Sequence, residues 1–226
     1  MKNNFRYCAF FDVDETLINT KSMFSFLKFF CVEKYKYFPV FGYFKYFKLK
    51  ARIFFHKKMG KNREFLNRCY YQFYKGTKEE VMRNISKKWF LRALENEQFF
   101  NLSVLKELKR HQENQAEIVF VSGSFAYCLE PIAEYLGVLR ILATNLEIVE
   151  ESLTGNILGN PVIGEGKVEA IKKYISVGKI QLQDCYAYGD HISDLPMLNL
   201  VGNPAVISRS KDVVSYAKKN GWAIIY

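Results

Sequence analysis

The sequence predicts an α/β protein, with a Rossmann-like parallel sheet covered by helices on both faces and an inserted all-helical cap. Two observations favour this fold. From about residue 100 onward, short apolar and β-branched runs alternate with segments of helical spacing, which is typical of a parallel sheet. Residues 21–98 instead show helical spacing and no convincing strand.

The composition of the chain divides it in the same way. Residues 21–98 carry 19 Lys or Arg against 6 Asp or Glu, a net +13, whereas the remainder carries 14 against 17, a net −3. The same segment holds 21 of the 37 aromatic residues. A change this sharp indicates a separate module. We therefore predict a core formed by residues 1–20 and 99–226 and a basic, aromatic helical cap formed by residues 21–98.

The apolar run Tyr7 to Phe11 predicts the first buried strand. Helical spacing follows over residues 22–31, 43–58 and 64–74. Pro39 and Gly42 interrupt this pattern. Thr77, with Glu80 three residues later, forms a capping-box signature for another helix.

The rest of the chain alternates between the two kinds of element. Strands are expected over residues 117–121, 140–144, 146–149, 185–188 and 204–207, the last of which is the final strand expected, and residues 153–158 could be part of a hairpin. A further apolar run lies at residues 223–225. Helices are expected over residues 102–113, 126–136, 167–177 and 211–219. Strand–helix–strand units of this kind place the carboxyl ends of their strands at one edge of a sheet, where α/β proteins bind ligands.

Asp12 and Asp14 follow the first predicted strand directly. In an extended backbone their side chains point to the same side, so the two carboxylates repel unless a cation or a proton lies between them. Such a pair suits phosphoryl transfer, in which one carboxylate attacks phosphorus and the other gives and takes protons. A polar strand end followed by a helix cap would produce the same short motif.

Polar residues also occur at the ends of later elements, namely Ser122, Lys167, Asp190 and Asp194. Asp12 and Asp190 offer the hard oxygen ligands that Mg²⁺ prefers, and Asp194 could add a ligand or orient a metal-bound water. Lys167 would neutralise charge between Asp12 and a phosphate. Taken singly, each residue has a structural explanation, such as a helix cap, a solvated lysine or a turn. Their joint occurrence at element ends favours a site.

Four motifs in order carry a resemblance to a known family. They are Asp12-Val13-Asp14-Glu15-Thr16, Val121-Ser122-Gly123, Lys167 in Gly-Glu-Gly-Lys, and Gly189-Asp190-His191-Ile192-Ser193-Asp194. Over residues 5–19 and about 100–226 the chain resembles the haloacid dehalogenase (HAD) superfamily. Its details are most similar to subfamily IB, the phosphoserine phosphatase-like group, in which a helical cap lies between the first two motifs.

The resemblance implies a Mg²⁺-dependent phosphatase that acts on a small phosphorylated metabolite. Asp12 would form an aspartyl-phosphate, Asp14 would act as general acid and base, and Lys167 would complete the catalytic set. The metal would be held by Asp12, the backbone carbonyl of Asp14 and Asp190, with Asp194 as a further candidate. The expected phosphate-binding residues are Thr16, Ser122, Gly123, Lys167 and Ser193.

Two positions depart from the phosphoserine phosphatase pattern. Lys21 stands where those enzymes have a glutamate that receives the substrate's ammonium group, and Ser193 stands where they often have asparagine. The reversed charge argues against phosphoserine and makes Lys21 a specificity candidate for an anionic substrate. Transfer of the phosphoryl group to an acceptor other than water is the alternative enzymatic reading.

The cap suggests a second kind of partner. Aromatic and basic residues interleave from Tyr35 to Phe55, beyond what one narrow buried stripe can absorb, although most should form the core of a helical bundle. Such a surface could contact an anionic membrane peripherally. Nucleic acid is ranked lower because no recognition motif is present. A membrane- or polyanion-associated module without catalysis remains the non-enzymatic alternative.

The cysteines, the hydropathy and the histidines of the sequence support a few further expectations. The five cysteines are scattered without a Cys-x-x-Cys pair, which predicts reduced thiols in the cytoplasm. No long apolar run predicts a transmembrane helix, and a cleavable signal peptide is not expected. His56 and His111 are expected at the surface, and His191 has no assigned role. The sequence leaves the oligomeric state open.

Overall fold

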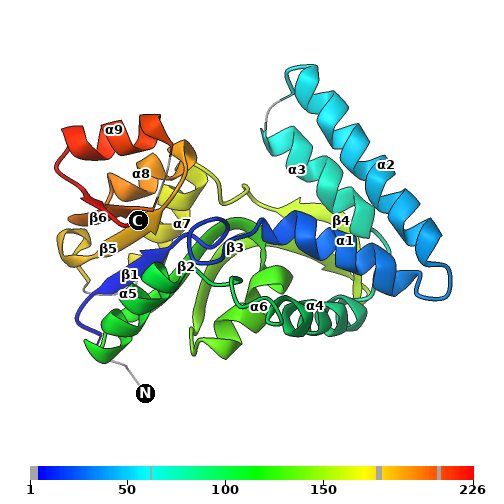
Figure 1. Ribbon diagram of the computed structural model, residues 1–226, viewed down its shortest axis with the longest axis horizontal. Coiled ribbons are helices and arrows are strands. Elements are labelled where there is room, and N and C mark those ends of the chain that lie inside the picture. The colour runs from blue at the N-terminus through cyan, green and yellow to red at the C-terminus, as the bar shows by residue number, and fades with distance from the viewer. Residues whose placement is uncertain (1–4, 62, 177–179, 208–209) are drawn as a thin grey trace.

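The computed structural model describes residues 5–61, 63–176, 180–207 and 210–226. Its centre is a seven-stranded sheet in the order β4-β3-β2-β1-β5-β6-β7, in which only β3 and β4 pair antiparallel (Figure 1). The strands are β1 (Cys8–Phe11), β2 (Glu117–Phe125), β3 (Arg140–Val149), β4 (Ser152–Leu158), β5 (Tyr186–Gly189), β6 (Asn203–Val206) and β7 (Ala223–Ile224). The predicted α/β class with a mainly parallel sheet is confirmed.

The helices fall into a core set and a cap set. The core helices are α5 (Leu102–Glu113), α6 (Ala126–Tyr135), α7 (Glu165–Ile175), α8 (Leu195–Leu198) and α9 (Lys211–Lys219). The cap helices are α1 (Ser22–Lys34), α2 (Pro39–Lys58), α3 (Arg63–Tyr71) and α4 (Glu79–Ala93). Short 3₁₀ helices are η1 (Gln72–Tyr74), η2 (Leu182–Asp184) and η3 (Ile192–Asp194). The predicted end of α7 at Val177 lies outside the described residues.

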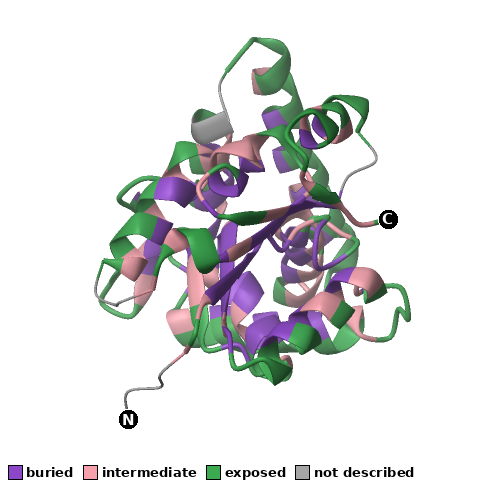
Figure 2. Cartoon of the chain, turned by 90° about the vertical axis from the view of Figure 1, so that its left-hand side faces the viewer, coloured by how far each residue is buried: buried purple, intermediate pink, exposed green. Residues whose placement is uncertain are grey.

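The central strand β1 is buried on both faces. Ala9 and Phe11 belong to a hydrophobic cluster with side chains of α5 and α6, whereas Cys8 and Phe10 belong to a second cluster with side chains of α7, α8 and α9. This alternation follows from the two-residue period of a strand. Figure 2 shows the resulting band of buried residues through the middle of the sheet. A strand with no solvated face needs a continuous apolar run, which is what the sequence has.

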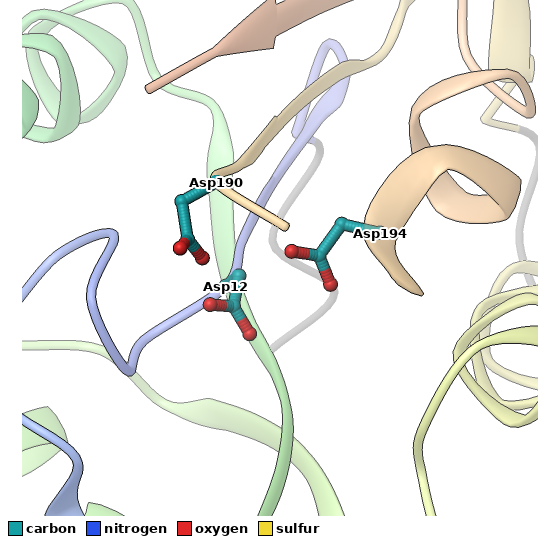
Figure 3. A group of neighbouring side chains, drawn as sticks. All are labelled: Asp12, Asp190 and Asp194. Carbon is teal, nitrogen blue, oxygen red and sulfur yellow. The ribbon is translucent and has the colours of Figure 1, made fainter. Parts of the chain in front are cut away.

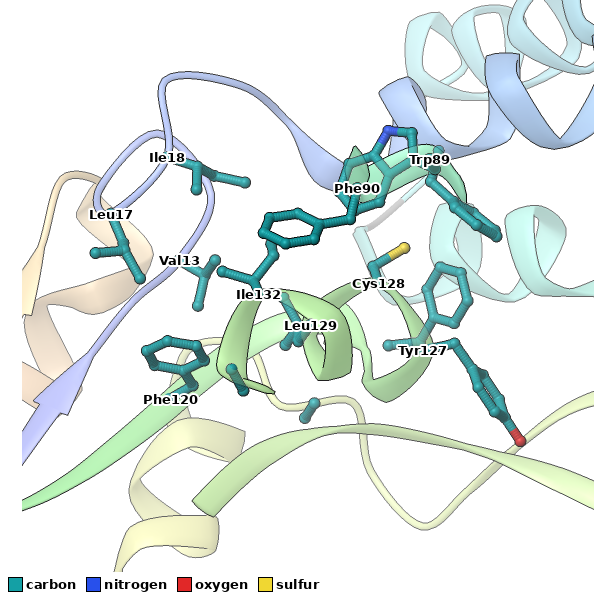
Figure 4. Close-up of a cluster of buried hydrophobic side chains, with 14 of the residues drawn as sticks. Val13, Leu17, Ile18, Trp89, Phe90, Phe120, Tyr127, Cys128, Leu129 and Ile132 are labelled. Carbon is teal, nitrogen blue, oxygen red and sulfur yellow. The ribbon is translucent and has the colours of Figure 1, made fainter. Parts of the chain in front are cut away.

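The cap is joined to the core through α4. Trp89 and Phe90 of α4 lie in the same buried cluster as Ile132 of α6 and Phe120 of β2 (Figure 4). The hydroxyl of Ser86 donates a hydrogen bond to the backbone carbonyl of Tyr127, the second residue of α6. One hydrophobic core therefore continues from the sheet into the cap.

The β3–β4 hairpin extends the sheet beneath the cap. The backbone amide of Gly76 donates to the carbonyl of Leu153 at 2.7 Å, and the amide of Leu153 donates to the carbonyl of Thr77 at 2.9 Å. The amide of Glu79 donates to the carbonyl of Glu151 at 2.8 Å. These hydrogen bonds satisfy backbone groups just before α4 and at its first residue, Glu79, that have no partner within that helix.

Helix α2 differs from its predicted form. Pro39 begins the helix, a position where its missing amide has no consequence, and Gly42 lies inside it. A Cβ atom at Gly42 would lie 2.6 Å from the carbonyl oxygen of Cys31, so glycine lets α2 approach α1 closely. The predicted interruption is confirmed at Pro39, because residues 35–38 separate α1 from α2, and it was wrong at Gly42, which lies inside α2 and serves its packing.

The structure differs from the local predictions at Thr77, in β3 and at the end of β2. Thr77 does not cap α4; the residue before the helix is Lys78, and Thr77 is buried with no hydrogen-bond partner for its hydroxyl among the described residues. The two strands expected over 140–149 form the single strand β3. β2 continues past Ser122 to Phe125, with a register shift against β3.

Within the described ranges, no helix combines the length and apolar character required to cross a bilayer. All five cysteines are free thiols and are buried. Both His56 and His111 were expected at the surface. His56 is half-buried, whereas His111 is wholly buried, so the prediction for His111 was wrong. Burial of His111 is tolerated because its two ring nitrogens form hydrogen bonds with the hydroxyls of Tyr7, at 2.9 Å, and Tyr188, at 2.7 Å.

Candidate active site

Three carboxylates meet at the carboxyl edge of the sheet. Asp12 follows β1, and its backbone amide donates to the carbonyl of Tyr188 in β5 at 2.9 Å. Asp190 follows β5, and Asp194 ends the 3₁₀ helix η3. An oxygen from each of the three lies within 4.8 Å of the others, as their side chains in Figure 3 illustrate. The parallel pairing of β1 and β5 is what brings residues almost 180 positions apart together.

Lys167 supplies the positive charge of this cluster. Its ammonium group lies 2.5 Å from Asp12 Oδ1 and 2.8 Å from Asp194 Oδ1. All three side chains are almost wholly buried. Lys167 reaches them from the first turn of α7. A buried ammonium between two carboxylates holds both at fixed positions, and losing it would leave unpaired charge inside the protein.

Burial shifts the protonation of these groups. It raises the pKa of the Asp12 carboxyl to about 8, although Lys167 lowers it, while Asp194 and Asp190 add negative charge that raises it. For Lys167, burial alone would lower the pKa, but Asp12 and Asp194 outweigh it and raise the pKa. Burial, followed by Asp194, raises the pKa of Asp190 to about 6. A divalent cation among these oxygens would favour the ionised carboxylates.

Asp14 sits apart from the three clustered carboxylates. Its Oδ1 accepts a hydrogen bond from the backbone amide of Ser22 at 2.9 Å, at the N-terminus of α1. Burial raises the pKa of Asp14 to about 6, and the hydrogen bonds from Ser22 partly offset this. A carboxyl group with a pKa near neutrality can both donate and accept a proton under ordinary conditions.

The turn after Asp14 is tight. The amides of Leu17 and Ile18 both donate to the carbonyl of Val13 at 3.0 Å. Glu15 adopts a left-handed conformation with φ of 61°, which is strained for a residue with a side chain. Its carboxylate forms an ion pair with Lys21 at 3.0 Å. The turn therefore places Asp14 against the start of the cap.

Thr16 and His191 position the acidic residues. The Thr16 hydroxyl, fully buried, donates to Asp190 Oδ1 at 3.1 Å, a partner that the phosphate-binding prediction did not include. His191 caps η3: its Nδ1 accepts from the amide of Ser193 at 3.1 Å, and its own amide donates to Asp194 Oδ2 at 3.1 Å. This reciprocal cap gives His191 the role that its sequence context did not suggest.

The end of β2 forms another wall of the site. Ser122 is buried, and its hydroxyl accepts from the amide of Ser124 at 3.1 Å. The Ser124 hydroxyl lies 2.8 Å from that of Ser22. Ser22 and Ser124 thus connect the Asp14 region to β2, and sequence reasoning did not single out either residue. Their positions, next to Lys21 and within Ser-Gly-Ser, were the available signal.

A cleft of about 460 Å³ lies between the core and the cap. Asp12, Asp14, Ser122, Gly123, Lys167, Asp190, Ser193 and Asp194 line it from the core. The cap contributes apolar side chains and the lysines Lys21, Lys57 and Lys61. The structure therefore places every predicted site residue at this cleft except Thr16, which lies behind Asp190.

A mainly parallel α/β sheet, with clustered carboxylates and a lysine at its carboxyl edge under a helical cap, defines a class of hydrolase. A family model described as haloacid dehalogenase-like hydrolase matches residues 9–199. The chain belongs to this family.

Curated relatives match parts of the chain. A probable phosphatase of Mycobacterium tuberculosis is 34% identical over 109 residues, which cover 48% of this chain and 38% of that protein. A histidinol-phosphatase of Neisseria meningitidis is 28% identical over 122 residues, covering 52% of this chain and 55% of that protein. The chain thus spans only about half or less of the length of these relatives.

Solved structures share the whole fold. A Bordetella pertussis protein of unknown function superposes with a TM-score of 0.84 at 22% identity, covering 99% of both chains. A phosphoserine phosphatase, solved as a phospho-aspartyl intermediate analogue, gives a TM-score of 0.64 at 21% identity, covering 98% of this chain and 93% of that one. At these identities the likeness establishes the fold alone.

Proposed function

We propose that the chain is a Mg²⁺-dependent phosphomonoester hydrolase that works through an aspartyl-phosphate on Asp12. The observation that carries this proposal is the buried Asp12 carboxylate, held by Lys167 at 2.5 Å beside two further carboxylates at the sheet edge. Family membership and relatives that are named phosphatases support it.

The acidic cluster fits Mg²⁺. Asp12, Asp190 and Asp194 offer hard oxygen donors within one coordination sphere of each other, and the backbone carbonyl of Asp14 is a further candidate. When bound, the cation would supply positive charge that offsets the charge of the substrate phosphate. Nitrogen and sulfur ligands play no part in this donor set, which favours Mg²⁺ over zinc.

In the first step an Asp12 oxygen attacks phosphorus and the bond from phosphorus to the ester oxygen breaks. Asp14 gives its proton to that oxygen, so the alcohol leaves neutral and Asp12 carries the phosphoryl group. In the second step the ionised Asp14 takes a proton from water, and the water oxygen attacks phosphorus. The bond from phosphorus to the Asp12 oxygen breaks, which releases phosphate and restores the Asp12 carboxylate. Lys167 would stabilise the negative charge throughout, with the Ser122 hydroxyl, the Gly123 backbone and Ser193 as further candidates for holding phosphate oxygens.

The substrate proposed is a small phosphorylated metabolite other than phosphoserine. Lys21, Lys57 and Lys61 line the cap side of the cleft, where Glu15 is the nearby acidic group and is paired with Lys21. An ammonium group on the substrate would meet repulsion there, whereas a second anionic group would be attracted. The relatives' names, one for histidinol phosphate and others for phosphoserine, concern those proteins and differ among themselves.

The test is phosphate release with and without Mg²⁺ from amino-acid, sugar, nucleotide and lipid head-group phosphates. We expect metal-dependent release by the wild type and none by Asp12→Asn. Acid quenching during turnover should trap a phosphorylated protein that hydroxylamine cleaves, as an acyl phosphate requires. Release that persists in Asp12→Asn would overturn the proposal, and added alcohols distinguish hydrolysis from phosphoryl transfer by their phosphorylated products.

The charge argument has its own test. Lys21→Gln should raise KM for substrates that carry a second anionic group and leave KM for uncharged phosphate esters nearly unchanged. Lys75→Gln, an exposed lysine outside the cleft, is the matched control. Equal KM values for Lys21→Gln and wild type on every substrate would remove Lys21 from the specificity site.

A further inference from the structure

The outward-facing side of α2 is unusually apolar for a solvent-exposed helix. Nearly half of the exposed large apolar side chains among the described residues lie between positions 37 and 59. Five of them recur along α2 at helical spacing, and basic side chains flank them. We call this surface the α2 outer face; it comprises Val40, Phe44, Phe47, Phe54, Phe55, Lys48, Lys50, Arg52 and Lys58.

The opposite side of α2 is already occupied. Gly42, Tyr46, Leu49 and Ile53 are buried on that side, where the helix packs on α1 and α3. Phe44, Phe47 and Phe54 are each 59% exposed. Figure 1 shows α2 at the opposite end of the molecule from α9, with no described element beyond it. The aromatic side chains of the α2 outer face therefore exceed what the cap bundle uses for its own packing.

Charge decides which partner this surface fits. Residues 34–61 contain nine Lys or Arg and no Asp or Glu. Some of these lysines cover aromatic rings, with Lys45 Nζ 5.0 Å from the ring centre of Phe41 and Lys58 Nζ 5.1 Å from that of Phe54. The α2 outer face has aromatic side chains at its centre and only basic charged side chains at its edges. It therefore complements a surface that carries negative charge on the outside and is apolar just beneath.

We propose that the α2 outer face docks on an anionic lipid bilayer. The Phe side chains would enter the boundary between head groups and acyl chains, while the flanking Lys and Arg side chains would contact lipid phosphates. A second copy of this chain fits less well, because an isologous dimer would oppose two uniformly basic faces. The proposal stands on the surface alone and does not depend on the phosphatase activity.

Docking would also bring the cleft to the membrane. Ile53 and Lys57 of α2, and Lys61 just after it, line the cleft, so one helix separates the proposed lipid contact from the proposed active site. The experiment must therefore leave these three residues intact. Lys48, Lys50 and Arg52 are exposed and lie outside the cleft lining, which makes them suitable for charge reversal.

The experiment is sedimentation of the full chain with vesicles of phosphatidylcholine alone and of phosphatidylcholine with phosphatidylglycerol, at low and high salt. We expect binding to the anionic vesicles only, weakened by salt. The triple variant Lys48→Glu, Lys50→Glu, Arg52→Glu should weaken binding roughly 100-fold. The matched control Lys106→Glu, Lys109→Glu, Lys172→Glu makes the same change in net charge on exposed positions of α5 and α7 and should bind as the wild type does.

Two further measurements separate insertion from simple adsorption and from other partners. Tryptophan fluorescence of Phe47→Trp should shift to the blue on anionic vesicles, whereas that of Leu91→Trp, 65% exposed on α4, should not. Absence of vesicle binding, equal binding to neutral vesicles, or triple and control variants that bind alike would overturn the proposal. So would a concentration-dependent dimer abolished by Phe44→Ser and Phe47→Ser, or binding to nucleic acid in place of vesicles. Circular dichroism of each variant confirms that it is folded.

Discussion

Lys167 Nζ lies 2.5 Å from Asp12 Oδ1, although 155 positions separate the two residues in the chain. The same ammonium reaches Asp194 at 2.8 Å. A single buried cation thus joins the strand that carries the proposed nucleophile to the helical turn after β5. This ion pair has consequences for both stability and activity.

Replacing Lys167 with Met should abolish turnover, by about 10³-fold or more, because no other buried cation faces Asp12 among the described residues. It should also lower the free energy of unfolding by about 3 kcal/mol, since Asp12 and Asp194 lose their partner. Urea denaturation measures the second effect, and Mg²⁺ should restore part of the loss. Unchanged stability with and without Mg²⁺ would contradict the pairing; Lys172→Met, an exposed lysine on α7, is the control.

The proposed acid role of Asp14 predicts a difference between leaving groups. With a pKa of about 6, Asp14 loses its proton as the pH rises above 6, so hydrolysis of an alkyl phosphate should decline on the alkaline side. p-Nitrophenyl phosphate needs no proton on its leaving oxygen, so formation of the phosphoenzyme from it should keep its rate. Rapid-mixing rates of leaving-group release from both esters across pH measure this.

Asp14→Asn should slow alkyl phosphate hydrolysis by about 10³-fold. With p-nitrophenyl phosphate it should release close to one equivalent of nitrophenol in a burst and then stall, because no base activates the water that hydrolyses the phosphoenzyme in the second step. Asp12→Asn should give no burst. A variant at Asp14 that turns over both esters steadily would show that the proton comes from elsewhere.

His111 predicts a pH dependence of stability. Burial, followed by the nearby Arg110 charge, lowers its pKa to about 4 in the folded protein, against about 6.5 when unfolded. Between these values the unfolded chain binds more protons, so the free energy of unfolding should fall as the pH drops from 6.5 to 4, by up to about 3 kcal/mol. His111→Gln removes this contribution. Denaturation of both proteins across that range should show a flatter slope for the variant, and parallel slopes would contradict the burial.

The close approach of α1 and α2 at Gly42 predicts that a side chain at this position lowers the stability of the protein. Gly42→Ala places a Cβ about 2.6 Å from a backbone oxygen that cannot move aside, so we expect the protein to lose about 1–3 kcal/mol of stability. Ala51→Ser changes an exposed position of the same helix and should cost little. Thermal unfolding of both variants measures the contrast. A Gly42→Ala protein as stable as wild type would mean that the two helices can separate without loss.

The fold could be predicted because its signals are local. The buried strand before Asp12 is a continuous apolar run, and the strand before Asp190 stops at a glycine. The carboxyl ends of both strands can therefore be recognised in the sequence. The candidate site followed from these ends, since parallel strands bring their carboxyl ends together.

What the sequence could not predict depends on contacts between distant segments. His111 looked like a surface residue near the end of a polar helix, and only the Tyr7 and Tyr188 hydroxyls make its burial favourable. Thr77 had the spacing of a cap, but its segment is held by backbone hydrogen bonds to the β3–β4 hairpin. The pairing of Lys167 with Asp194, and the Ser22–Ser124 contact, likewise join segments whose proximity is not encoded locally.

The hydrogen bonds between residues 76–79 and the β3–β4 hairpin bear on how caps could be exchanged between related proteins. Cutting the chain at residues 20 and 99 would transfer α4 without the β3–β4 hairpin, whose Glu151 carbonyl accepts a hydrogen bond from the amide of the first residue of α4. A recombinant that also receives residues 140–158 would keep those bonds. The unit that can be exchanged with its backbone hydrogen bonds intact is therefore discontinuous in the chain. A cap-exchange experiment should transfer residues 21–98 and residues 140–158 together.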